Sequence, residues 1–363
     1  MSGEDDSGPP RARHNPDLFG HADAEETVTK AWASGRFPHA WLICGPQGIG
    51  KATLAYRMAR WVLAGGDGGQ GAGLFGEPAG DGLYLSPESG TFRRIVSGGH
   101  PDFRALERPE GKTSIPVEDV RGILGFVHQT PAESDWKAIV IDSADELNTS
   151  GANAILKALE EPPPHTLFLL VSHAPGRLLP TIRSRCRKLT LSPLSPDDMR
   201  ALIRQHAPDI SDSDAGILIQ LGEGSIGRAL DYAAAGGIDL YRAVLVLLSN
   251  PARPDPKQLY GLADTLSPKH AEAAYLAFRN LFDWWIKRAI RSQATGIRPA
   301  IVVPEEERAL EGWNALGGLE TSMQLWEKLT GLLAQSDNPA NLDKRQLIVA
   351  AFGELQKVAT ARR

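Results

Sequence analysis

The chain has 363 residues, a formal net charge of −5 and ordinary fractions of apolar and charged residues, which predict a globular protein of two or three domains. The negative charge provides no overall basic field of the kind that attracts a protein to nucleic acid. Two cysteines, Cys44 and Cys186, are too few for a disulfide framework or a four-cysteine zinc site. We also expect no signal peptide and no membrane span, and therefore a cytoplasmic location.

The clearest pattern lies near residue 45, where a short apolar run leads into a glycine-rich loop. Residues 40–44 predict a buried strand, and residues 52–63 predict a helix. Between them, glycines would turn backbone N–H groups inward beside a helix N-terminus, which is the context of a P-loop that holds phosphates. The candidate nucleotide-binding residues of this loop are Gly45, Pro46, Gln47, Gly48, Ile49, Gly50, Lys51, Ala52 and Thr53.

The residue after Lys51 departs from the usual P-loop. Ser or Thr normally stands there, and its hydroxyl ligates Mg²⁺, whereas this chain has Ala52. Thr53 follows one residue later, which is about 100° further around a helix, so we do not expect it to replace the missing ligand. The loop can therefore accept ATP or ADP, but it should hold Mg²⁺ weakly.

Residues 64–100 are crowded with glycine and lack sustained periodicity. We interpret them as a long, partly flexible surface insertion. The stretch contains no cysteine, and His100 is its only histidine, so we expect no zinc site there.

A second buried strand is predicted at 137–142 and a third at 166–172, with a helix at 151–161 between them. Proline at positions 162–164 ends that helix. Strands that alternate with helices in this way predict an α/β domain with a parallel sheet.

The strand at 137–142 has the form of a Walker B strand, because it ends in Asp142, a residue type that holds Mg²⁺ in such sites. ATPases of this broad type usually follow that Asp with a Glu that activates water. Here Ser143 follows, and serine is a poor general base without a partner. Two altered positions, Ala52 and Ser143, predict weak or absent hydrolysis, and we assign no metal-ligating residues.

After Pro193 the strand signal fades and helical patterns continue to the end. We predict a P-loop nucleotide-binding domain at 1–191, a small helical lid domain at 192–238, in which Ser195 caps the first helix, and a helical collar or oligomerisation domain at 239–363. Two apolar stripes in the last domain indicate core packing: Tyr275, Phe278, Phe282 and Trp285 in one helix, and Ile348, Phe352 and Leu355 in another.

Basic residues gather in two places, at Arg183, Arg185, Arg187 and Lys188, and at Lys287, Arg288 and Arg291. Such a cluster is more often a solvated face than a binding site. Contacts of these residues with a DNA backbone would be independent of sequence and sensitive to salt. The net negative charge argues against strong DNA binding by the isolated chain.

Several segments resemble the clamp-loader branch of the AAA+ ATPases and, within it, the delta-prime family of bacterial DNA polymerase III subunits. The resemblance is carried by NPDLFGH, GRFPHAWLICGPQGIGKATLA, DSADELNTSGANAILKALEEPPPHTLFLLVS, LLPTIRSRC, GSIGRAL and NLDKRQLIVAAF. It extends over most of the chain and is strongest from Phe37 to Leu191. Many members of the family carry a four-cysteine zinc module after the P-loop helix, and this chain does not.

The resemblance implies a five-subunit ring, shared with delta and gamma/tau subunits, that opens a sliding clamp and places it on primed DNA. Arg185, in the SRC motif, would act in trans as an arginine finger on the γ-phosphate of the adjacent motor subunit, an effect worth about 10³–10⁵ in rate. Ser172 or His173 would occupy the sensor 1 position and Arg228 the sensor 2 position. The chain would be a rigid, non-hydrolysing subunit whose contact with the clamp is indirect.

Two other functions remain open at this point. The first is an active motor subunit that resembles gamma/tau, against which Ala52 and Ser143 argue, as does the lack of a long proline-rich extension. The second is a stand-alone P-loop enzyme, such as a kinase or phosphoryl transferase. That enzyme would need a substrate domain with its own acid and base residues, whereas the pattern after Pro193 is helical.

Overall fold

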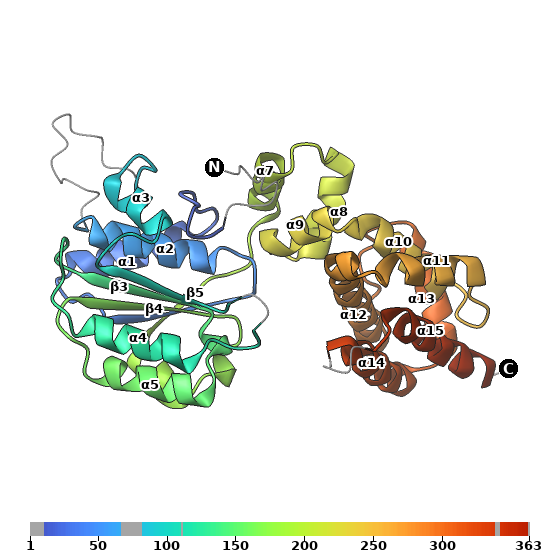
Figure 1. Ribbon diagram of the computed structural model, residues 1–363. Helices are drawn as coiled ribbons and strands as arrows, with labels where there is room; N and C mark the ends of the chain where they lie inside the picture. The colour runs from blue at the N-terminus through green and yellow to red at the C-terminus, as the bar shows by residue number, and fades with distance from the viewer. Residues whose placement is uncertain (1–10, 67–81, 110–111, 338–341, 362–363) are drawn as a thin grey trace. The chain divides into compact units, whose positions relative to one another are not determined.

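The computed structural model describes residues 11–66, 82–109, 112–337 and 342–361, and the chain forms two compact units (Figure 1). The first unit comprises Met1–Met199 and Gly224–Gly227. The second unit comprises Arg200–Glu223 and Arg228–Arg363.

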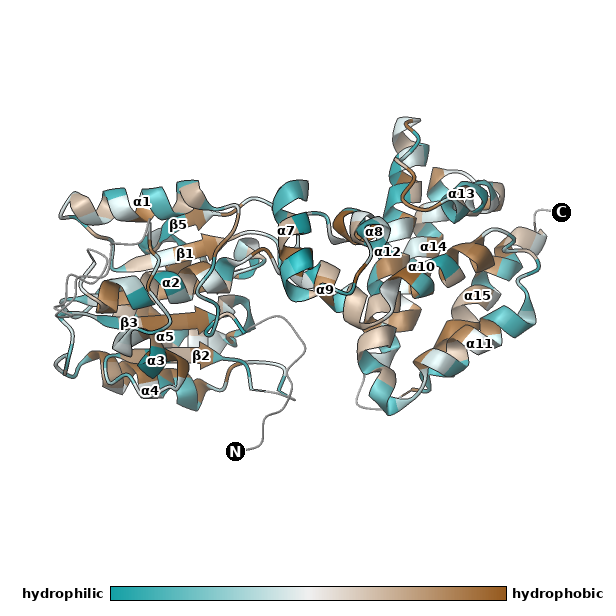
Figure 2. Ribbon diagram, turned by 90° about the horizontal axis from the view of Figure 1, so that it is seen from above, coloured by the Kyte–Doolittle hydropathy of each residue, from teal (hydrophilic) through white to brown (hydrophobic). Residues whose placement is uncertain are grey.

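The first unit is built on a five-stranded parallel sheet with the strand order β2-β3-β4-β1-β5. The strands are β1 (Ala40–Cys44), β2 (Phe103–Glu107), β3 (Lys137–Asp142), β4 (Thr166–Ser172) and β5 (Arg187–Thr190). β1 and β4 are buried along their whole length, and the strands appear as hydrophobic ribbons in Figure 2. Burial on both faces is the usual condition of a parallel sheet, and it confirms the predicted α/β fold.

Helices cover both faces of this sheet (Figure 1). One face carries α1 (Ala22–Ala33), α2 (Lys51–Leu63) and α3 (Gly90–Val96), and their buried side chains form one core with Trp41, Ile43 and Val140. The other face carries α4 (Val117–Val127), α5 (Thr149–Glu160) and α6 (Pro180–Arg185), which form a second core with Leu42 and Ile141. Two short 3₁₀ helices, η1 (Ala144–Glu146) and η2 (Pro175–Arg177), follow β3 and β4.

The predicted insertion at 64–100 contains ordered structure at its end. α3 buries Phe92 and Ile95, and the guanidinium of Arg60 on α2 lies 4.4 Å from the centre of the Phe92 ring. A helix of seven residues is too short to show a sustained period, which explains why the sequence pattern missed it. Residues 67–81, in the middle of the predicted insertion, lie outside the described residues.

The described part of the second unit is helical. It contains α8 (Asp212–Gly222) and most of α7 (Pro196–His206) and α9 (Ile226–Ala234). The remaining helices are α10 (Gly237–Leu248), α11 (Pro256–Leu266), η3 (Lys269–Ala271), α12 (Glu272–Thr295), α13 (Glu305–Leu316), α14 (Leu319–Leu333), η4 (Ala334–Asp337) and α15 (Lys344–Ala361). The boundary between the two units falls within α7 and within α9, so the three-domain division stays a prediction.

The aromatic stripe of α12 forms the core of the second unit, as predicted. Phe278 and Phe282 stack with their ring centres 5.7 Å apart, and Phe282 lies 5.8 Å from Phe352 of α15. Trp285 meets Trp313 of α13 edge to face at 5.7 Å. Aromatic pairs of this kind stabilise a core beyond the effect of their buried area.

Candidate functional site

The glycine-rich loop at 45–51 joins the carboxyl end of β1 to the first turn of α2. Gly45, Gly48 and Gly50 have φ angles of +147°, +75° and +103°, in a region that L side chains rarely adopt. A Cβ atom at Gly45 would also lie 2.6 Å from the carbonyl oxygen of Leu191. These positions therefore require glycine, and the loop they shape presents backbone N–H groups at a helix N-terminus, where an anion is stabilised.

Lys51 lies at the base of this loop with only 3% of its surface exposed. Its Nζ donates a hydrogen bond to the carbonyl oxygen of Pro46. Burial lowers the pKa of Lys51 to about 8, although the nearby carboxylates of Asp142 and Asp145 oppose the change. A buried ammonium with this environment gains most from a further negative charge, such as a phosphate oxygen.

Ala52 occupies the position at which a P-loop usually has a hydroxyl, and its methyl group packs against the core of the first unit. Thr53 is buried on α2, one residue further along the helix. The residues of this loop fit a phosphate chain through backbone amides and Lys51. They do not provide the usual hydroxyl ligand for Mg²⁺.

Asp142 is the last residue of β3, in register with Glu107 at the end of β2. Burial raises its pKa to about 6, and the like charges of Glu107 and Glu146 act in the same direction, against the opposing effect of Lys51. A carboxyl group with this pKa is still mostly ionised at pH 7 and becomes mostly protonated at pH 5. Asp142 can therefore serve as a metal ligand at neutral pH, and this ability is lost in mild acid.

Asp145, in η1, connects the ends of β3 and β4. Its carboxylate accepts hydrogen bonds from Ser143 Oγ at 3.1 Å, Ser172 Oγ at 2.8 Å and the backbone N–H groups of His173 and Ala174. Burial opposes ionisation, but these hydrogen bonds prevail and hold the pKa of Asp145 below its usual value. The two sensor 1 candidates, Ser172 and His173, thus both donate hydrogen bonds to Asp145. The hydroxyl of Ser143 donates to the same carboxylate.

The sequence pattern did not identify Asp145 as a site residue. Its partners Ser172 and His173 stand 27 and 28 residues away, and a contact of this kind becomes visible only when β3 and β4 are neighbours in the sheet. The available signal was an acidic residue shortly after a buried strand.

Two further contacts that the sequence did not predict support the loop. His21 Nε2 lies 2.7 Å from the carbonyl oxygen of Ile49 and is buried. The backbone N–H of Gly227 donates to the carbonyl oxygen of Gly48 at 2.9 Å, and a Cβ atom at Gly227 would lie 3.0 Å from Gly48 Cα. The segment before α1 and the start of α9 therefore fix the backbone of the loop from two directions.

Arg228, the sensor 2 candidate, follows Gly227 directly but belongs to the second unit. There its Nη1 donates to Glu223 Oε2 at 3.4 Å. Its predicted role toward a nucleotide stays a prediction.

Arg185 is the last residue of α6, on the face of the sheet opposite α2. Its Nη2 forms an ion pair with Glu160 Oε1 at 2.6 Å, and its Nη1 donates to the carbonyl oxygen of Thr181 at 3.0 Å. Cys186, which follows, is buried, and burial raises the pKa of its thiol to about 12, so it packs as a neutral group.

Arg185 and the glycine-rich loop lie at opposite ends of the strands: Arg185 is near their amino ends, and the loop is at their carboxyl ends. In the parallel pairing of β1 with β5, Trp41 is opposite Arg187, and Cys44 is opposite Thr190. Arg185 therefore precedes the amino end of β5, whereas the loop follows the carboxyl end of β1. The strands between these ends are about 10–15 Å long, so the arrangement does not bring Arg185 and Lys51 together in one site.

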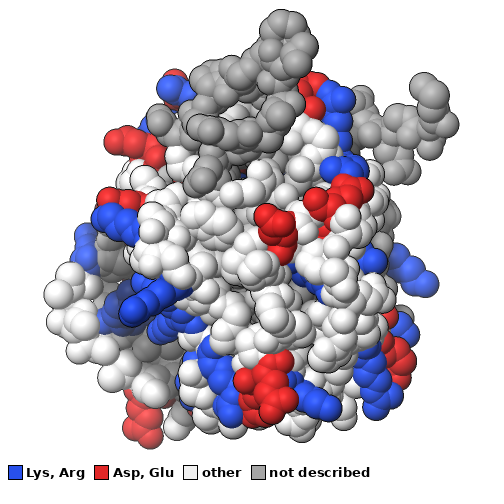
Figure 3. Space-filling model, turned by 90° about the vertical axis from the view of Figure 1, so that its left-hand side faces the viewer, with Lys and Arg blue, Asp and Glu red and all other residues white. Residues whose placement is uncertain are grey.

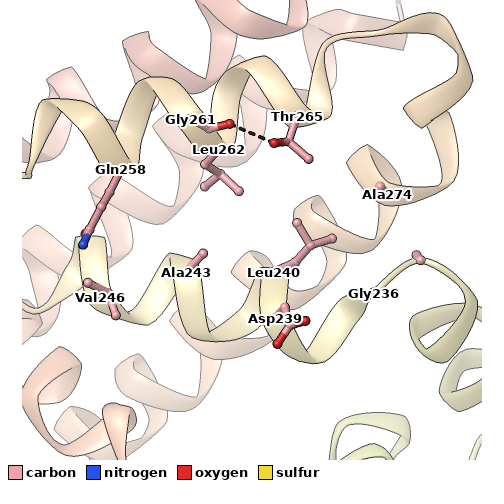
Figure 4. A pocket seen from close by; sticks show the side chains of 11 residues that line it. Gly236, Asp239, Leu240, Ala243, Val246, Gln258, Gly261, Leu262, Thr265 and Ala274 are labelled. Atoms are coloured by element: carbon pink, nitrogen blue, oxygen red, sulfur yellow. Dashed lines mark hydrogen bonds between the residues drawn. The ribbon is translucent and has the colours of Figure 1, made fainter.

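The second unit contains a cavity of about 550 Å³ between α10 and α11 (Figure 4). Its wall is formed by small and apolar residues such as Ala243, Leu240 and Leu262, and Asp239 is its charged residue. The hydrogen bond drawn there, from Thr265 to the carbonyl oxygen of Gly261 at 2.9 Å, lies within α11. This cavity includes none of the predicted site residues and has no cation to receive a phosphate.

The second basic cluster is partly neutralised within the fold. Lys287 pairs with Asp283 at 2.6 Å, and Arg288 pairs with the buried Glu306 at 3.0 Å. We therefore assign no DNA-binding surface to this cluster. Figure 3 looks onto the first unit, where small groups of Lys and Arg side chains lie beside small groups of Asp and Glu side chains.

Within the described residues, no group of three or more His, Cys, Asp or Glu side chains could hold a metal ion. In the same part of the chain, no helix has the length and apolar character needed to cross a membrane.

Parts of this chain are similar to known proteins. Residues 20–195 match the family model described as DNA polymerase III, delta subunit. The chain is 40% identical over 148 residues to a DNA polymerase III subunit delta' of Pseudomonas aeruginosa, which covers 41% of each chain. It is 27% identical over 285 residues to a DNA polymerase III subunit gamma/tau of Mycobacterium tuberculosis, which covers 75% of this chain and 46% of that one. The chain thus spans less than two thirds of the length of these relatives.

Among solved structures, a DNA polymerase III gamma subunit-related protein from Thermotoga maritima overlaps 93% of this chain and 100% of its own, with 16% identity and a TM-score of 0.43.

Proposed function

We propose that this chain is the delta-prime-like subunit of a clamp loader, because residues 20–195 match the model of the DNA polymerase III delta subunit family and 148 residues are 40% identical to a subunit delta'. In this role it forms a ring of five subunits with delta and gamma/tau subunits, and the ring places a sliding clamp on primed DNA. Its own P-loop holds a nucleotide without cleaving it. Its catalytic contribution is Arg185, which it supplies to a neighbouring subunit.

The observation that carries this proposal is that the P-loop has the groups that bind phosphates but lacks its usual hydroxyl ligand for Mg²⁺. The loop has the glycine backbone and the buried Lys51 that ATP or ADP needs. In place of the metal-ligating hydroxyl it has Ala52, and the pKa of Asp142 is raised to about 6 by burial and neighbouring acids. Mg²⁺, if bound with a nucleotide, would supply charge neutralisation there, and Asp142 is the chain's ligand for it.

Ser143 adds a second reason to expect no hydrolysis at this site. It stands where a water-activating Glu is usual, and its hydroxyl donates to Asp145 at 3.1 Å. A neutral serine hydroxyl is too weak a base to take a proton from water, and the Asp145 carboxylate beside it already accepts four hydrogen bonds. The site therefore lacks both the usual hydroxyl ligand and a base.

The location of Arg185 supports action on a neighbour. It precedes the amino end of β5, at the end of the strands opposite the chain's own loop, and about a third of its side chain is exposed. A guanidinium placed in this way can reach the phosphates of another subunit but not those bound at Lys51. Its charge would then stabilise the transition state of phosphoryl transfer on that subunit.

An active motor subunit is the second candidate, because the similarity to the gamma/tau relative extends over 75% of this chain. The two candidates differ in what the isolated chain should do. A motor subunit would need a metal ligand and a base in its own site, and Ala52 and Ser143 provide neither.

The test is to measure nucleotide binding and ATP hydrolysis with the purified chain. We expect ADP to bind with an affinity that changes little when Mg²⁺ is added, and ATP turnover to stay at background. Lys51→Ala should abolish the binding. Lys30→Ala should leave it unchanged, because Lys30 is an exposed lysine paired with Glu26 on α1. Robust turnover by the chain alone would contradict the proposal in favour of the motor subunit.

A further inference from the structure

Glu160 is the partner of Arg185 in this chain. It is the last residue of α5, and its Oε1 lies 2.6 Å from Arg185 Nη2, with 45% of the Glu160 side chain and 34% of the Arg185 side chain exposed. The carbonyl oxygen of Thr181 binds the other terminal nitrogen of Arg185 at 3.0 Å. Two of the three guanidinium nitrogens are thus held from within the chain, in a side chain that remains open to the outside.

The position of Glu160 is unfavourable for the helix that carries it. A carboxylate at the C-terminus of a helix adds negative charge to the negative end of the helix dipole, where Lys or Arg is preferred. Glu161 follows it immediately as the C-cap and increases the effect. The stability of α5 therefore does not explain Glu160, whereas the pairing with Arg185 does.

The backbones on both sides of this pair are fixed by the core. Leu159, next to Glu160, and Ile182, on α6, are buried in the same core cluster. Cys186, next to Arg185, belongs to that cluster as well. Because both backbones pack into the core, the ion pair with Glu160 and the hydrogen bond to Thr181 hold the guanidinium of Arg185 in place.

We propose that Glu160 is a positioning residue for Arg185, and that it orders the guanidinium before a neighbouring subunit presents its nucleotide. This inference rests on the trans role of Arg185 proposed above. A free arginine side chain samples many rotamers, and part of this conformational entropy is lost whenever it engages a partner. Glu160 and Thr181 remove part of that loss in advance, in the way that a supporting shell orders a catalytic group.

The effect should be modest, because both side chains are partly exposed. Exposed ion pairs stabilise by about 0–1 kcal/mol, which corresponds to at most about a fivefold change in rate. The change should appear in kcat. KM for ATP should stay constant, because ATP binds to the loop of the neighbouring subunit and not to Arg185 alone.

The experiment uses the reconstituted ring, assembled with motor subunits whose own corresponding arginines are replaced by alanine. The ATP site next to Arg185 is then the one site that still has an arginine finger, so the measured turnover comes from that site. Glu160→Gln removes the charge but keeps the size of the side chain, and we expect it to lower kcat about two- to fivefold. Glu161→Gln makes the same change in charge one residue away and should leave kcat unchanged.

A double-mutant cycle separates positioning from a merely structural role. In the Arg185→Ala background, Glu160→Gln should cause no further loss. An equal loss in both backgrounds, or a kcat of Glu160→Gln that equals or exceeds that of the unmodified ring, would overturn the inference while Arg185 kept its role. If Arg185→Ala itself left kcat unchanged, the proposed function would fail first.

Discussion

Three side chains decide what the P-loop of this chain can do. Lys51 is buried, and burial lowers its pKa to about 8, while burial raises the pKa of Asp142 to about 6. Both shifts reduce the charge that the site carries without a ligand. Ala52 removes the hydroxyl that would fix a metal ion. At the residue scale, the site is adapted to a phosphate chain more than to a metal ion.

The lowered pKa of Lys51 predicts a pH dependence of nucleotide binding. Below about pH 8 the ammonium is charged and attracts phosphate, and above that value it loses its proton. The affinity for ADP should therefore fall as pH rises through 8, by up to about tenfold at pH 9, where about a tenth of the lysine is still protonated. Titration of a fluorescent ADP analogue from pH 6.5 to 9.5 measures this change.

Lys51→Arg is the matched control, because arginine stays protonated throughout this range. Its affinity, even if weaker at neutral pH, should stay constant between pH 7 and 9. An unmodified chain whose affinity did not change above pH 8 would show that the charge on Lys51 does not contribute to binding.

At the scale of elements, the carboxyl ends of β3 and β4 are joined by Asp145. Ser172, on β4, is completely buried, and its hydroxyl donates to Asp145 at 2.8 Å. The backbone N–H groups of His173 and Ala174 also donate to this carboxylate. Removal of such an acceptor leaves donors unpaired, which costs about 1–3 kcal/mol for each buried group.

We therefore expect Asp145→Ala to loosen the chain after β4. The amides of His173 and Ala174 should exchange hydrogen about tenfold faster or more, since about 1.4 kcal/mol corresponds to one factor of ten. Hydrogen exchange followed by mass spectrometry over residues 166–174 measures this directly. Asp135→Ala, at an exposed position before β3, should leave these amides unaffected. Unchanged exchange in Asp145→Ala would contradict the role given to this carboxylate.

The same network has a pH dependence of definite sign. The hydrogen bonds lower the pKa of Asp145, so its stabilising effect is complete above the unfolded value of 3.8 and is lost as pH falls through the lower folded value. The accelerated exchange of Asp145→Ala should therefore be visible at neutral pH.

The elements differ in how well the sequence predicted them. Apolar runs identified β1, β3 and β4 with their observed bounds, because these strands are buried and almost uniformly apolar. The edge strands β2 and β5 escaped prediction, since they are short and only two of the five residues of β2 and one of the four residues of β5 are buried. In the glycine-rich loop, the motif predicted the glycines and Lys51. It did not predict the supporting contacts of His21, Gly227 and Asp145, because each depends on tertiary packing.

At the scale of the whole molecule, two properties that usually occur together in an ATPase are separated in this chain. The loop at Lys51 is proposed to hold a nucleotide, and Arg185, at the opposite end of the strands, is proposed to assist hydrolysis elsewhere. A subunit of this kind would need neither its own metal ligand nor its own base. The helical second unit, with its aromatic core around Phe282 and Trp285, would supply the collar by which such a subunit joins a ring.

The most direct test of the account is the turnover of ATP by a reconstituted ring in which the ATP site next to Arg185 is the one site that still has an arginine finger. Arg185→Ala should reduce turnover about 10³-fold, the lower end of the effect of an arginine finger. Arg183→Ala, an exposed arginine two residues earlier on the same helix, should leave turnover unchanged when DNA is absent. Turnover that survived Arg185→Ala, or that fell equally with Arg183→Ala, would contradict the claim that this chain contributes its catalytic group to another subunit.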